Sequence, residues 1–357
     1  MLYILVKNKY YDIESSFFIS GIQTHKSLQD YNRRMERNSK NLPSKRITLR
    51  REINGKSKTS CYFCDMNLST YMNYSSKLFL AFLTAFLLTG NLSAGCRIER
   101  RVMPCKLLQG ITEREYSVCL PASYDSQKER TYPVLYLLHG GGCHHTEWEE
   151  NGRLQAVVDS LVARKEMEEM IIVCPEACKD NMIWFNAPHW TYEDYFFREL
   201  IPYIERTYRV KADRNHRGVA GFSMGGGAAV VYGLHHPELF SMVFDMSGYL
   251  RRQPLEFLKN DPSAEWRQQV VEDHNPIRTI ENASPQRVQA WKTVRWFVDC
   301  GDQDFTLEGN MDLVKAFRQQ GIGYQMRVRS GGHDWNYWHS SLDLALTYFT
   351  QCLPQDS

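Results

Sequence analysis

The sequence predicts an α/β domain with a mostly parallel central sheet that is flanked by helices. From about Cys96 onward, short β-rich apolar runs alternate with segments of helical periodicity. Most of these runs are unbroken rather than alternately polar, which is typical of strands that are covered on both faces. The chain of 357 residues is long enough for one such domain, because single α/β domains of about 250 residues are common.

Apolar runs and helical spacing predict the elements of this domain in chain order. The predicted strands are Tyr116–Leu120, Val134–Leu138, Met170–Val173, Gly218–Ala220, Met242–Met246, Val294–Val298 and Tyr324–Val328. The predicted helices are Leu154–Arg164, Tyr195–Thr207, Met224–His235, Met311–Gln319 and Ser341–Phe349. In the helix Tyr195–Thr207 the apolar side chains recur at helical spacing, which indicates core packing rather than a binding surface.

A charged insertion at about 247–293 separates the strands Met242–Met246 and Val294–Val298, and four prolines interrupt it. A connection of this length is uncommon in a compact domain unless it serves a function. We expect it to form a cap near the functional site. A surface excursion without function is the alternative.

The composition is that of a globular protein and excludes several classes. With 43% hydrophobic and 24% charged residues, the chain is neither collagen-like, wholly disordered nor a multi-span membrane protein. Residues 1–65 carry 13 Lys and Arg against 6 Asp and Glu, so the basic excess lies outside the predicted domain. Since that domain has no basic stripe, we expect no nucleic-acid partner. The cysteines show no zinc-type spacing beyond a single pair, Cys61 and Cys64, so we expect no metal site.

Residues 72–95 predict a secretory signal peptide. After a short, basic start, an apolar run of eleven residues, Leu78–Leu88, is followed by small residues. The run is too short to cross a bilayer, which takes about 20 residues. Residues 1–71 are polar and basic, so we expect a disordered tail or an over-extended start, with translation beginning at Met66 or Met72.

The end of the signal peptide determines where the mature chain begins. Cys96 follows Gly95 directly, as in a bacterial lipoprotein, although Ser93 stands where Leu is usual. We therefore expect a secreted or periplasmic protein whose folded domain is 96–357. A lipid anchor at Cys96 stays open as its one link to a membrane.

The segment Gly221–Gly225 reads GFSMG between an apolar strand and a small-residue helix. A GxSxG sequence in this context is typical of a nucleophile elbow, a sharp turn that exposes the hydroxyl of its serine. Glycine on both sides removes side chains that would collide with the neighbouring strand and helix. We therefore expect Ser223 to be a nucleophile at the N-terminus of the helix, where positive partial charge stabilises anions.

A serine nucleophile needs a base to take its proton and a carboxylate to orient that base. His333 is the candidate base, because it lies in a glycine-containing loop after the last predicted strand, on the edge where catalytic loops gather. Three carboxylates, Asp299, Asp302 and Asp304, lie at or beyond the end of the strand Val294–Val298. The position beyond the turn favours Asp304, and Asp302 is the alternative.

Two further groups of residues belong to the predicted site. HGGG at 139–142 is typical of loops whose backbone N–H groups bind an oxyanion, since glycine lets the main chain approach the substrate. We expect one donor from Gly141 or Gly142 and the other from Met224. Among the aromatic residues near these motifs, Trp184 and Trp335 are the candidates for contact with substrate, although large aromatic side chains also fill cores.

Together these motifs resemble the Putative esterase family of α/β-hydrolases, which includes esterase D, S-formylglutathione hydrolases, tributyrin esterases, feruloyl esterase domains and mycolyltransferases. The likeness lies in YPVLYLLHGGGCHHTEW, the run from DYFFRELIPYIE to VAGFSMGGGAA, DCGDQDF and GGHDWNYWHSSL. It implies the α/β-hydrolase fold with a cap insertion after the sixth strand. It also implies that Ser223, Asp304 and His333 are the nucleophile, the acid and the base.

The resemblance and the predicted export imply a secreted serine carboxylesterase that acts through an acyl-enzyme on acetyl or feruloyl esters of plant carbohydrate. Its partner is then a small-molecule or carbohydrate ester, and the reaction needs no metal or organic cofactor. Two alternatives keep the site, namely an acyltransferase and a general short-chain esterase similar to the tributyrin or S-formylglutathione enzymes. A third is a non-catalytic carbohydrate-binding protein on a hydrolase scaffold. The oligomeric state is left open.

Overall fold

The computed structural model describes residues 95–177, 184–250, 262 and 264–354, together with four strands near the N-terminus. The chain divides into two units, Met1–Leu92 and Ser93–Ser357. In the first unit, an antiparallel sheet has the strand order β2-β1-β3-β4. Its strands are β1 (Tyr3–Val6), β2 (Ser15–Ser16), β3 (Ile47–Ile53) and β4 (Lys56–Tyr62). The sequence did not predict these strands, and the predicted signal peptide at 72–95 lies outside the described residues apart from Gly95.

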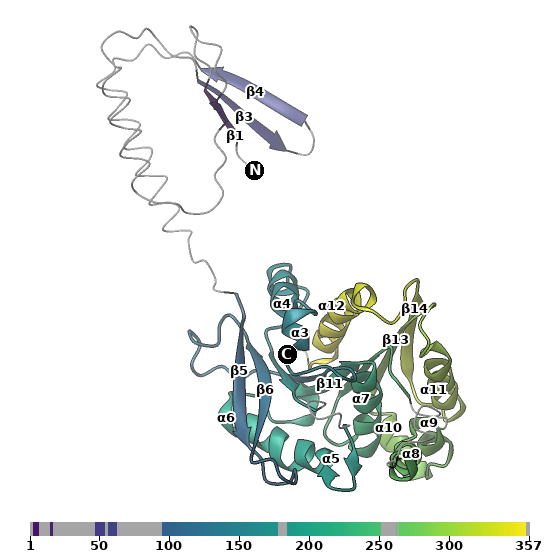
Figure 1. Cartoon of the computed structure of the whole chain (residues 1–357). Coiled ribbons are helices and arrows are strands. Elements are labelled where there is room, and N and C mark those ends of the chain that lie inside the picture. Colours follow the sequence, from purple (N-terminus) through teal and green to yellow (C-terminus); the bar gives the residue numbers. More distant parts are fainter. Residues whose placement is uncertain are drawn as a thin grey trace. The chain divides into compact units, whose positions relative to one another are not determined.

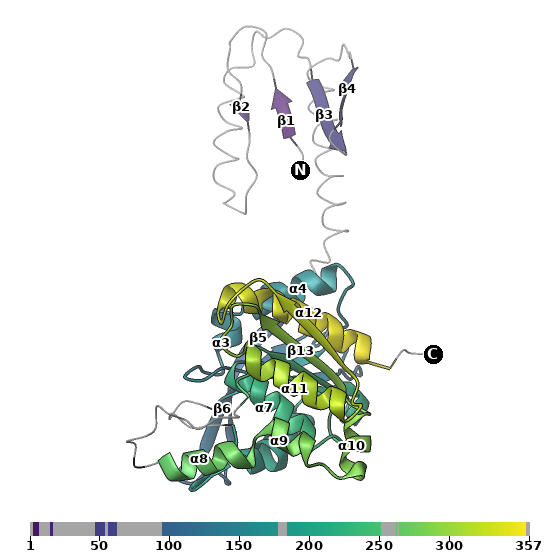
Figure 2. The same ribbon diagram turned by 90° about the vertical axis from the view of Figure 1, so that its right-hand side faces the viewer.

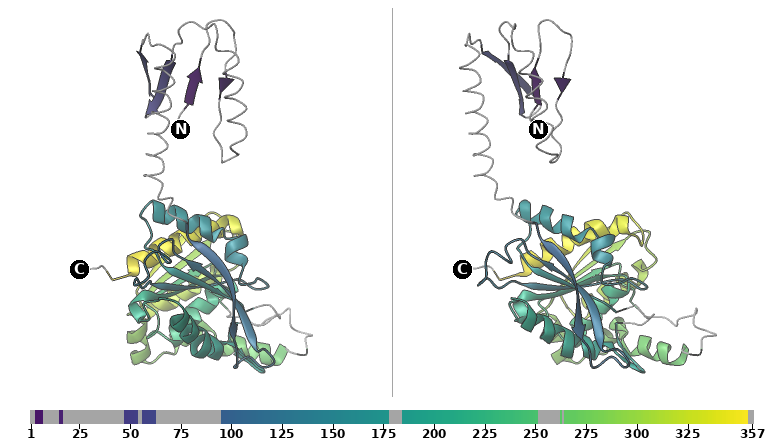
Figure 3. Two further views of the ribbon diagram at one scale, coloured as in Figure 1. Left: turned by 90° about the vertical axis from the view of Figure 1, so that its left-hand side faces the viewer. Right: turned by 60° about the vertical axis from the view of Figure 1, so that its left-hand side comes forward.

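The second unit is built on an eight-stranded sheet with the order β14-β13-β12-β11-β7-β8-β6-β5. The pairs from β14 to β8 are parallel, whereas β6 pairs antiparallel with both β8 and β5. The strands are β5 (Arg97–Pro104), β6 (Glu113–Leu120), β7 (Val134–Leu138), β8 (Ile171–Pro175), β11 (Arg217–Phe222), β12 (Met242–Met246), β13 (Arg295–Gly301) and β14 (Tyr324–Arg329). In Figure 3 the blue strands β5 and β6 cross the others steeply, which shows the twist of the sheet. The predicted mostly parallel sheet is confirmed.

Helices cover both faces of this sheet (Figures 1 and 2). One face carries α3 (Glu147–Glu150), α4 (Leu154–Ala163) and α12 (Trp335–Cys352). The other carries α5 (Tyr192–Tyr195), a π-helical turn (Phe196–Leu200), α6 (Ile201–Thr207), α7 (Met224–His235) and α11 (Leu307–Gln319). Short segments complete the unit: a two-stranded sheet of β9 (Asn186–Ala187) and β10 (Trp190–Thr191), and a 3-10 turn at Arg214–His216. None of the described helices is long and apolar enough to cross a membrane.

The unbroken apolar strands divide their side chains between two cores. In β7, Leu135 and Leu137 belong to the core beneath α4 and α12, whereas Val134, Tyr136 and Leu138 belong to the core beneath α7. All five side chains are fully buried. Because burying each of such side chains contributes about 1.5–3 kcal/mol, a strand with two buried faces needs no polar positions.

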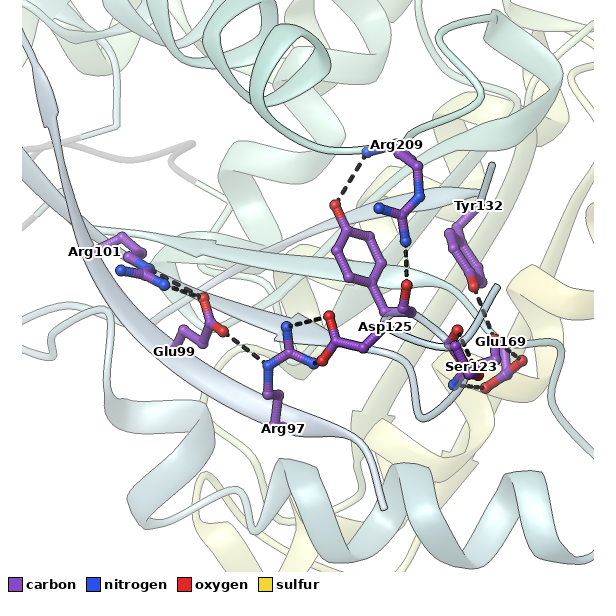
Figure 4. A network of polar contacts seen from close by, with 10 residues as sticks. Arg97, Glu99, Arg101, Ser123, Asp125, Tyr132, Glu169 and Arg209 are labelled. Carbon is purple, nitrogen blue, oxygen red and sulfur yellow. Dashed lines mark hydrogen bonds and ion pairs between the residues drawn. The ribbon is translucent and has the colours of Figure 1, made fainter. Parts of the chain in front are cut away.

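The sequence did not predict β5, because this edge strand reads RIERRVMP and is rich in charge. Figure 4 shows that its charges pair with one another and with a neighbouring loop. Glu99 accepts from Arg97 at 2.8 Å and from Arg101 at 2.6 Å, and Arg97 also lies 2.6 Å from Asp125. Charged side chains on an edge strand disfavour pairing with another chain. Their charge therefore suits a position at the edge, where an apolar run is not needed.

The insertion at 247–293 follows β12, the sixth strand of the sheet in chain order, and its described residues form three helices. These are α8 (Ala264–Asp273), α9 (Pro276–Glu281) and α10 (Pro285–Trp291). Trp291 is fully buried, and its indole N–H donates to Leu234 O of α7 at 2.8 Å. The C-terminal part of the insertion thus packs as a layer of the domain, and a capping role for the rest stays a prediction.

Candidate active site

The elbow at Ser223 joins β11 to α7. Ser223 has φ 54° and ψ −120°, a conformation that residues other than glycine rarely adopt. Its N–H donates to Met246 O at 3.0 Å, and its carbonyl accepts from Gly227 N at 3.0 Å and from Tyr249 N at 2.8 Å. These three bonds stabilise the strained turn, which leaves Ser223 partly exposed.

The glycines on either side of the elbow are required sterically. A Cβ on Gly221 would lie 2.5 Å from the backbone of Gly225. A Cβ on Gly225 would in turn lie 2.5 Å from the carbonyl oxygen of His139. Any larger residue at either position would therefore displace the backbone that forms the turn, which explains the GxSxG pattern.

His333 connects Ser223 with Asp304. Its Nε2 lies 2.8 Å from Ser223 Oγ, and its Nδ1 lies 2.9 Å and 3.0 Å from the two carboxylate oxygens of Asp304. The three side chains follow β11, β13 and β14, whose carboxyl ends lie on one edge of the sheet. This is the hydrogen-bond order that a nucleophile, its base and an orienting acid require.

The other two carboxylates near the end of β13 face elsewhere. Asp302 accepts the N–H of Gly331 at 3.1 Å. Asp299 is fully buried and accepts from the guanidinium of Arg327 at 2.8 and 2.6 Å and from the Tyr337 hydroxyl at 2.8 Å. Of the three aspartates that the sequence left open, Asp304 is thus the one in contact with the histidine.

Thr306, which the sequence motifs did not predict as a site residue, holds the carboxylate of Asp304 in place. Its N–H and its hydroxyl both donate to Asp304 Oδ1, at 2.8 and 2.7 Å. Burial raises the pKa of Asp304, but the hydrogen bonds from His333 and Thr306 outweigh burial and lower that pKa below its usual value. A threonine two residues after an aspartate, in a turn, was the available signal.

The loop that carries His333 is fastened to the loop that carries Asp304. Gln303 N donates to Gly331 O at 2.9 Å, in addition to the bond between Gly331 N and the Asp302 carboxylate. Gly331 has φ 149°, a conformation that favours glycine. The distance between His333 and Asp304 is therefore maintained by hydrogen bonds between the two loops as well as by the contact between the side chains.

The predicted oxyanion loop is a tight turn after β7. The buried His139 has its pKa lowered to about 4 by burial, so its imidazole is neutral at pH 7. Its Nδ1 lies 2.8 Å from Gly140 O, and its Nε2 accepts the N–H of Ala177 at 3.2 Å. Among the described residues, no backbone hydrogen bond is donated by the N–H groups of Gly141, Gly142 and Met224 outside the regular helices and strands. These groups are thus available to a substrate oxygen.

The chain matches a known family over most of this unit. Residues 111–349 match the model of the family described as "Putative esterase". The chain belongs to this esterase family. It is similar to a solved ferulic acid esterase, with 40% sequence identity and a TM-score of 0.68 over 72% of this chain and 99% of that chain. The esterase is a carboxylesterase hydrolase with the α/β-hydrolase fold.

Two curated relatives also carry ester-cleaving names. The esterase is similar to an endo-1,4-beta-xylanase/feruloyl esterase from Xylanibacter ruminicola, with 27% sequence identity. That alignment covers 64% of this chain and 28% of the relative. It is also similar to an acetyl esterase from Caldicellulosiruptor saccharolyticus, with 22% sequence identity. That alignment covers 64% of this chain and 85% of the relative. The esterase thus spans little more than a quarter of the first relative.

The two tryptophans that the sequence proposed as substrate contacts lie in different surroundings. Trp184 is fully buried, with its ring centroid 4.9 Å from that of His139. This position makes Trp184 a packing residue behind the oxyanion loop rather than a platform for substrate, because a buried ring has no free face. Trp335 is partly exposed, and its indole N–H donates to Glu147 at 3.1 Å. In the described part of the esterase, no group of three or more His, Cys, Asp or Glu side chains is placed to hold a metal ion.

Proposed function

We propose that this carboxylesterase is an exported enzyme that removes feruloyl or acetyl groups from plant carbohydrate through an acyl-enzyme on Ser223. The observation that carries the mechanism is the 2.8 Å contact between Ser223 Oγ and His333 Nε2. The substrate class is supported by the relatives, which are named ferulic acid esterase, xylanase/feruloyl esterase and acetyl esterase.

Acylation begins when His333 Nε2 takes the proton of Ser223 and the oxygen attacks the ester carbonyl. The carbonyl oxygen becomes an anion, which accepts hydrogen bonds from the N–H of Met224 and from Gly141 or Gly142. The N-terminus of α7 adds positive partial charge at the same place. When the intermediate collapses, His333 returns its proton to the leaving alcohol.

Deacylation repeats the sequence with water as the nucleophile. His333 takes a proton from water, the hydroxide attacks the acyl-enzyme, and the acid leaves as Ser223 recovers its proton. Asp304 stays ionised throughout and stabilises the imidazolium that forms twice in each cycle. An acyltransferase would differ only in that an alcohol takes the place of water.

Ester hydrolysis by the Ser223→Ala variant tests the mechanism. We expect kcat on methyl ferulate and on p-nitrophenyl acetate to fall by about 10⁶-fold, because alanine removes the hydroxyl on which the proposed acyl-enzyme forms. A matched control is Ser340→Ala, which removes a serine of α12 whose hydroxyl donates to Tyr337 O. Wild-type rates in Ser223→Ala would overturn the mechanism. Butyryl esters and added alcohol acceptors, used in the same assay, separate a short-chain esterase and an acyltransferase from the proposed enzyme.

The surroundings of Cys96 support release from the membrane rather than a lipid anchor. Cys96 is 2% exposed, its N–H donates to Asp159 at 2.7 Å, and its thiol lies 3.7 Å from Gln155 O. A lipid on this thiol would have to leave the core, so we propose cleavage of the signal peptide without an anchor. N-terminal sequencing of exported protein tests this proposal, and a mature chain that begins at Met1 would contradict it.

A further inference from the structure

Phe305 is an exposed aromatic side chain beside the triad. It stands between Asp304 and Thr306, which are both 5% exposed, whereas Phe305 itself is 69% exposed. The other large apolar side chains that are exposed in the described residues are aliphatic and lie on β5, α11 and β14. Isolated exposed apolar side chains are common, so position rather than exposure makes Phe305 informative.

The ring of Phe305 lies against the imidazole of the base. The two ring centroids are 4.4 Å apart, with an interplanar angle of 51°. The ring centroid of Tyr249 lies 6.3 Å from that of Phe305. Tyr249 N donates to the carbonyl of Ser223, so both aromatic residues come from loops that also hold the triad.

The backbone keeps Phe305 in this position. Asp304 N donates to Gly301 O at 3.3 Å, and Leu307 N donates to Asp304 O at 3.0 Å. The N–H of Thr306 binds the Asp304 carboxylate. These bonds fix the main chain on both sides of Phe305, so the side chain starts from a fixed point beside the acid. An apolar surface is therefore presented to solvent beside the base.

The role of the imidazole identifies the part of the ester that meets this surface. His333 Nε2 lies 2.8 Å from Ser223 Oγ and has to pass its proton to the oxygen of the leaving alcohol. In the proposed mechanism the carbonyl oxygen, in contrast, binds the N–H of Met224 and that of Gly141 or Gly142. A ring that lies on the imidazole is therefore on the side of the alcohol.

We propose that Phe305, flanked by Tyr249, determines specificity for the alcohol half of the ester by stacking on a sugar ring. This inference rests on the proposed function and adds the alcohol to it. The face of an aromatic ring is electron-rich and packs well on a flat array of C–H groups, which a furanose or pyranose offers and a methyl group does not. The ring contacts of His333 in the described residues are Phe305 and Trp338, which offer no counter-charge to an ionic alcohol.

The test compares two esters that share an acyl group. Methyl ferulate and 5-O-feruloyl-L-arabinofuranose give the same acyl-enzyme, and kcat/KM reports acylation, when the alcohol is still bound. We expect Phe305→Ala to lower kcat/KM by about tenfold for the arabinose ester and by less than about twofold for methyl ferulate. Phe305→Tyr keeps the ring and should restore the preference. Met311→Ala, which shortens a 45% exposed side chain of α11, is the matched control and should change neither rate.

Each outcome decides the proposal. Equal losses on both esters, or no loss on either, would mean that Phe305 does not read the alcohol, and the proposal would be wrong. If the wild type cleaves neither ferulate ester, the feruloyl part of the proposed function has failed, and the same comparison is made with ethyl acetate and acetylated xylose. An enzyme that cleaves none of the four esters overturns both proposals. Thermal melting of each variant separates misfolding from lost specificity.

Discussion

The active site and a second buried cluster both place a carboxylate against histidine, but only the active site ends on a hydroxyl. The second cluster, which we call the Glu193 cluster, consists of Glu193 in α5, His235 at the end of α7 and His274 after α8. Glu193 is 8% exposed, and its carboxylate lies 2.6 Å from His235 Nδ1 and 3.2 Å from His274 Nε2. The other ring nitrogen of His274 lies 2.8 Å from Val270 O.

The difference between the clusters shows what turns these residue types into a catalytic group. In the active site, the free nitrogen of His333 faces the hydroxyl of Ser223, which a strained turn leaves partly exposed. In the Glu193 cluster, both ring nitrogens of His274 face oxygen atoms that carry no proton. That arrangement can join the insertion to the body of the domain, but it cannot activate a nucleophile.

Of the changes that compare the two clusters, Asp304→Asn should have the largest effect, because it removes the carboxylate that orients His333. An asparagine can donate to His333 Nδ1 and so favour the tautomer whose Nε2 carries a proton, which cannot accept the proton of the serine. We expect kcat to fall by about 10⁴-fold, as in serine proteases with the equivalent change. Steady-state kinetics on p-nitrophenyl acetate measure this loss.

Asp302→Asn is the matched control for this prediction. The Asp302 carboxylate binds Gly331 N and not the histidine, so its loss should disturb only the position of the loop. We expect a decrease in kcat of less than about tenfold. A larger decrease in kcat in Asp302→Asn than in Asp304→Asn would mean that Asp302, and not Asp304, is the acid of the triad.

The sequence predicted the elbow more securely than the acid for a physical reason. GFSMG records a steric requirement, since Gly221 and Gly225 have no room for a side chain, and such a requirement is visible in residue types. Asp302 and Asp304 are the same residue type two positions apart. Which one faces His333 depends on a turn whose hydrogen bonds leave no periodic trace.

Helix boundaries and the insertion illustrate a second limit. The sequence placed the last helix at Ser341–Phe349, whereas α12 begins at Trp335, because Asp334 caps it by accepting the Tyr337 N–H at 3.2 Å. No helix was predicted in the insertion, because α8 is mostly polar and its packing against the domain depends on residues that are distant in sequence. Trp184 illustrates the opposite error. Its place near the catalytic motifs suggested a contact with substrate, but its side chain is buried.

Glu193→Gln should affect stability rather than chemistry. Removing the charge leaves two partly buried imidazoles without their carboxylate, which typically costs about 3 kcal/mol. Urea unfolding should show this loss, while kcat/KM of the folded enzyme should stay within about twofold, because no residue of the cluster contacts the triad. Glu166→Gln, at an exposed ion pair with Arg164, is the matched control and should leave the unfolding midpoint unchanged. A loss of activity without a loss of stability would show that the two clusters are coupled.

The pH dependence of unfolding sharpens the same comparison at a smaller scale. Burial raises the pKa of Glu193, but the hydrogen bonds and charges of His235 and His274 outweigh it and lower the pKa to about 2. In the unfolded chain the pKa of this carboxyl is about 4.5. Because its pKa is lower in the folded state, the carboxylate stabilises the fold at pH values above the unfolded-state pKa. This stabilisation is lost as the pH falls toward the folded-state pKa. The two pKa values imply that on the order of 1 kcal/mol of this stabilisation disappears between pH 6 and pH 3.5. The difference in unfolding free energy between the wild type and Glu193→Gln should therefore shrink by this amount over that interval. A difference that stays constant with pH would mean that Glu193 does not titrate as a partner of the two histidines.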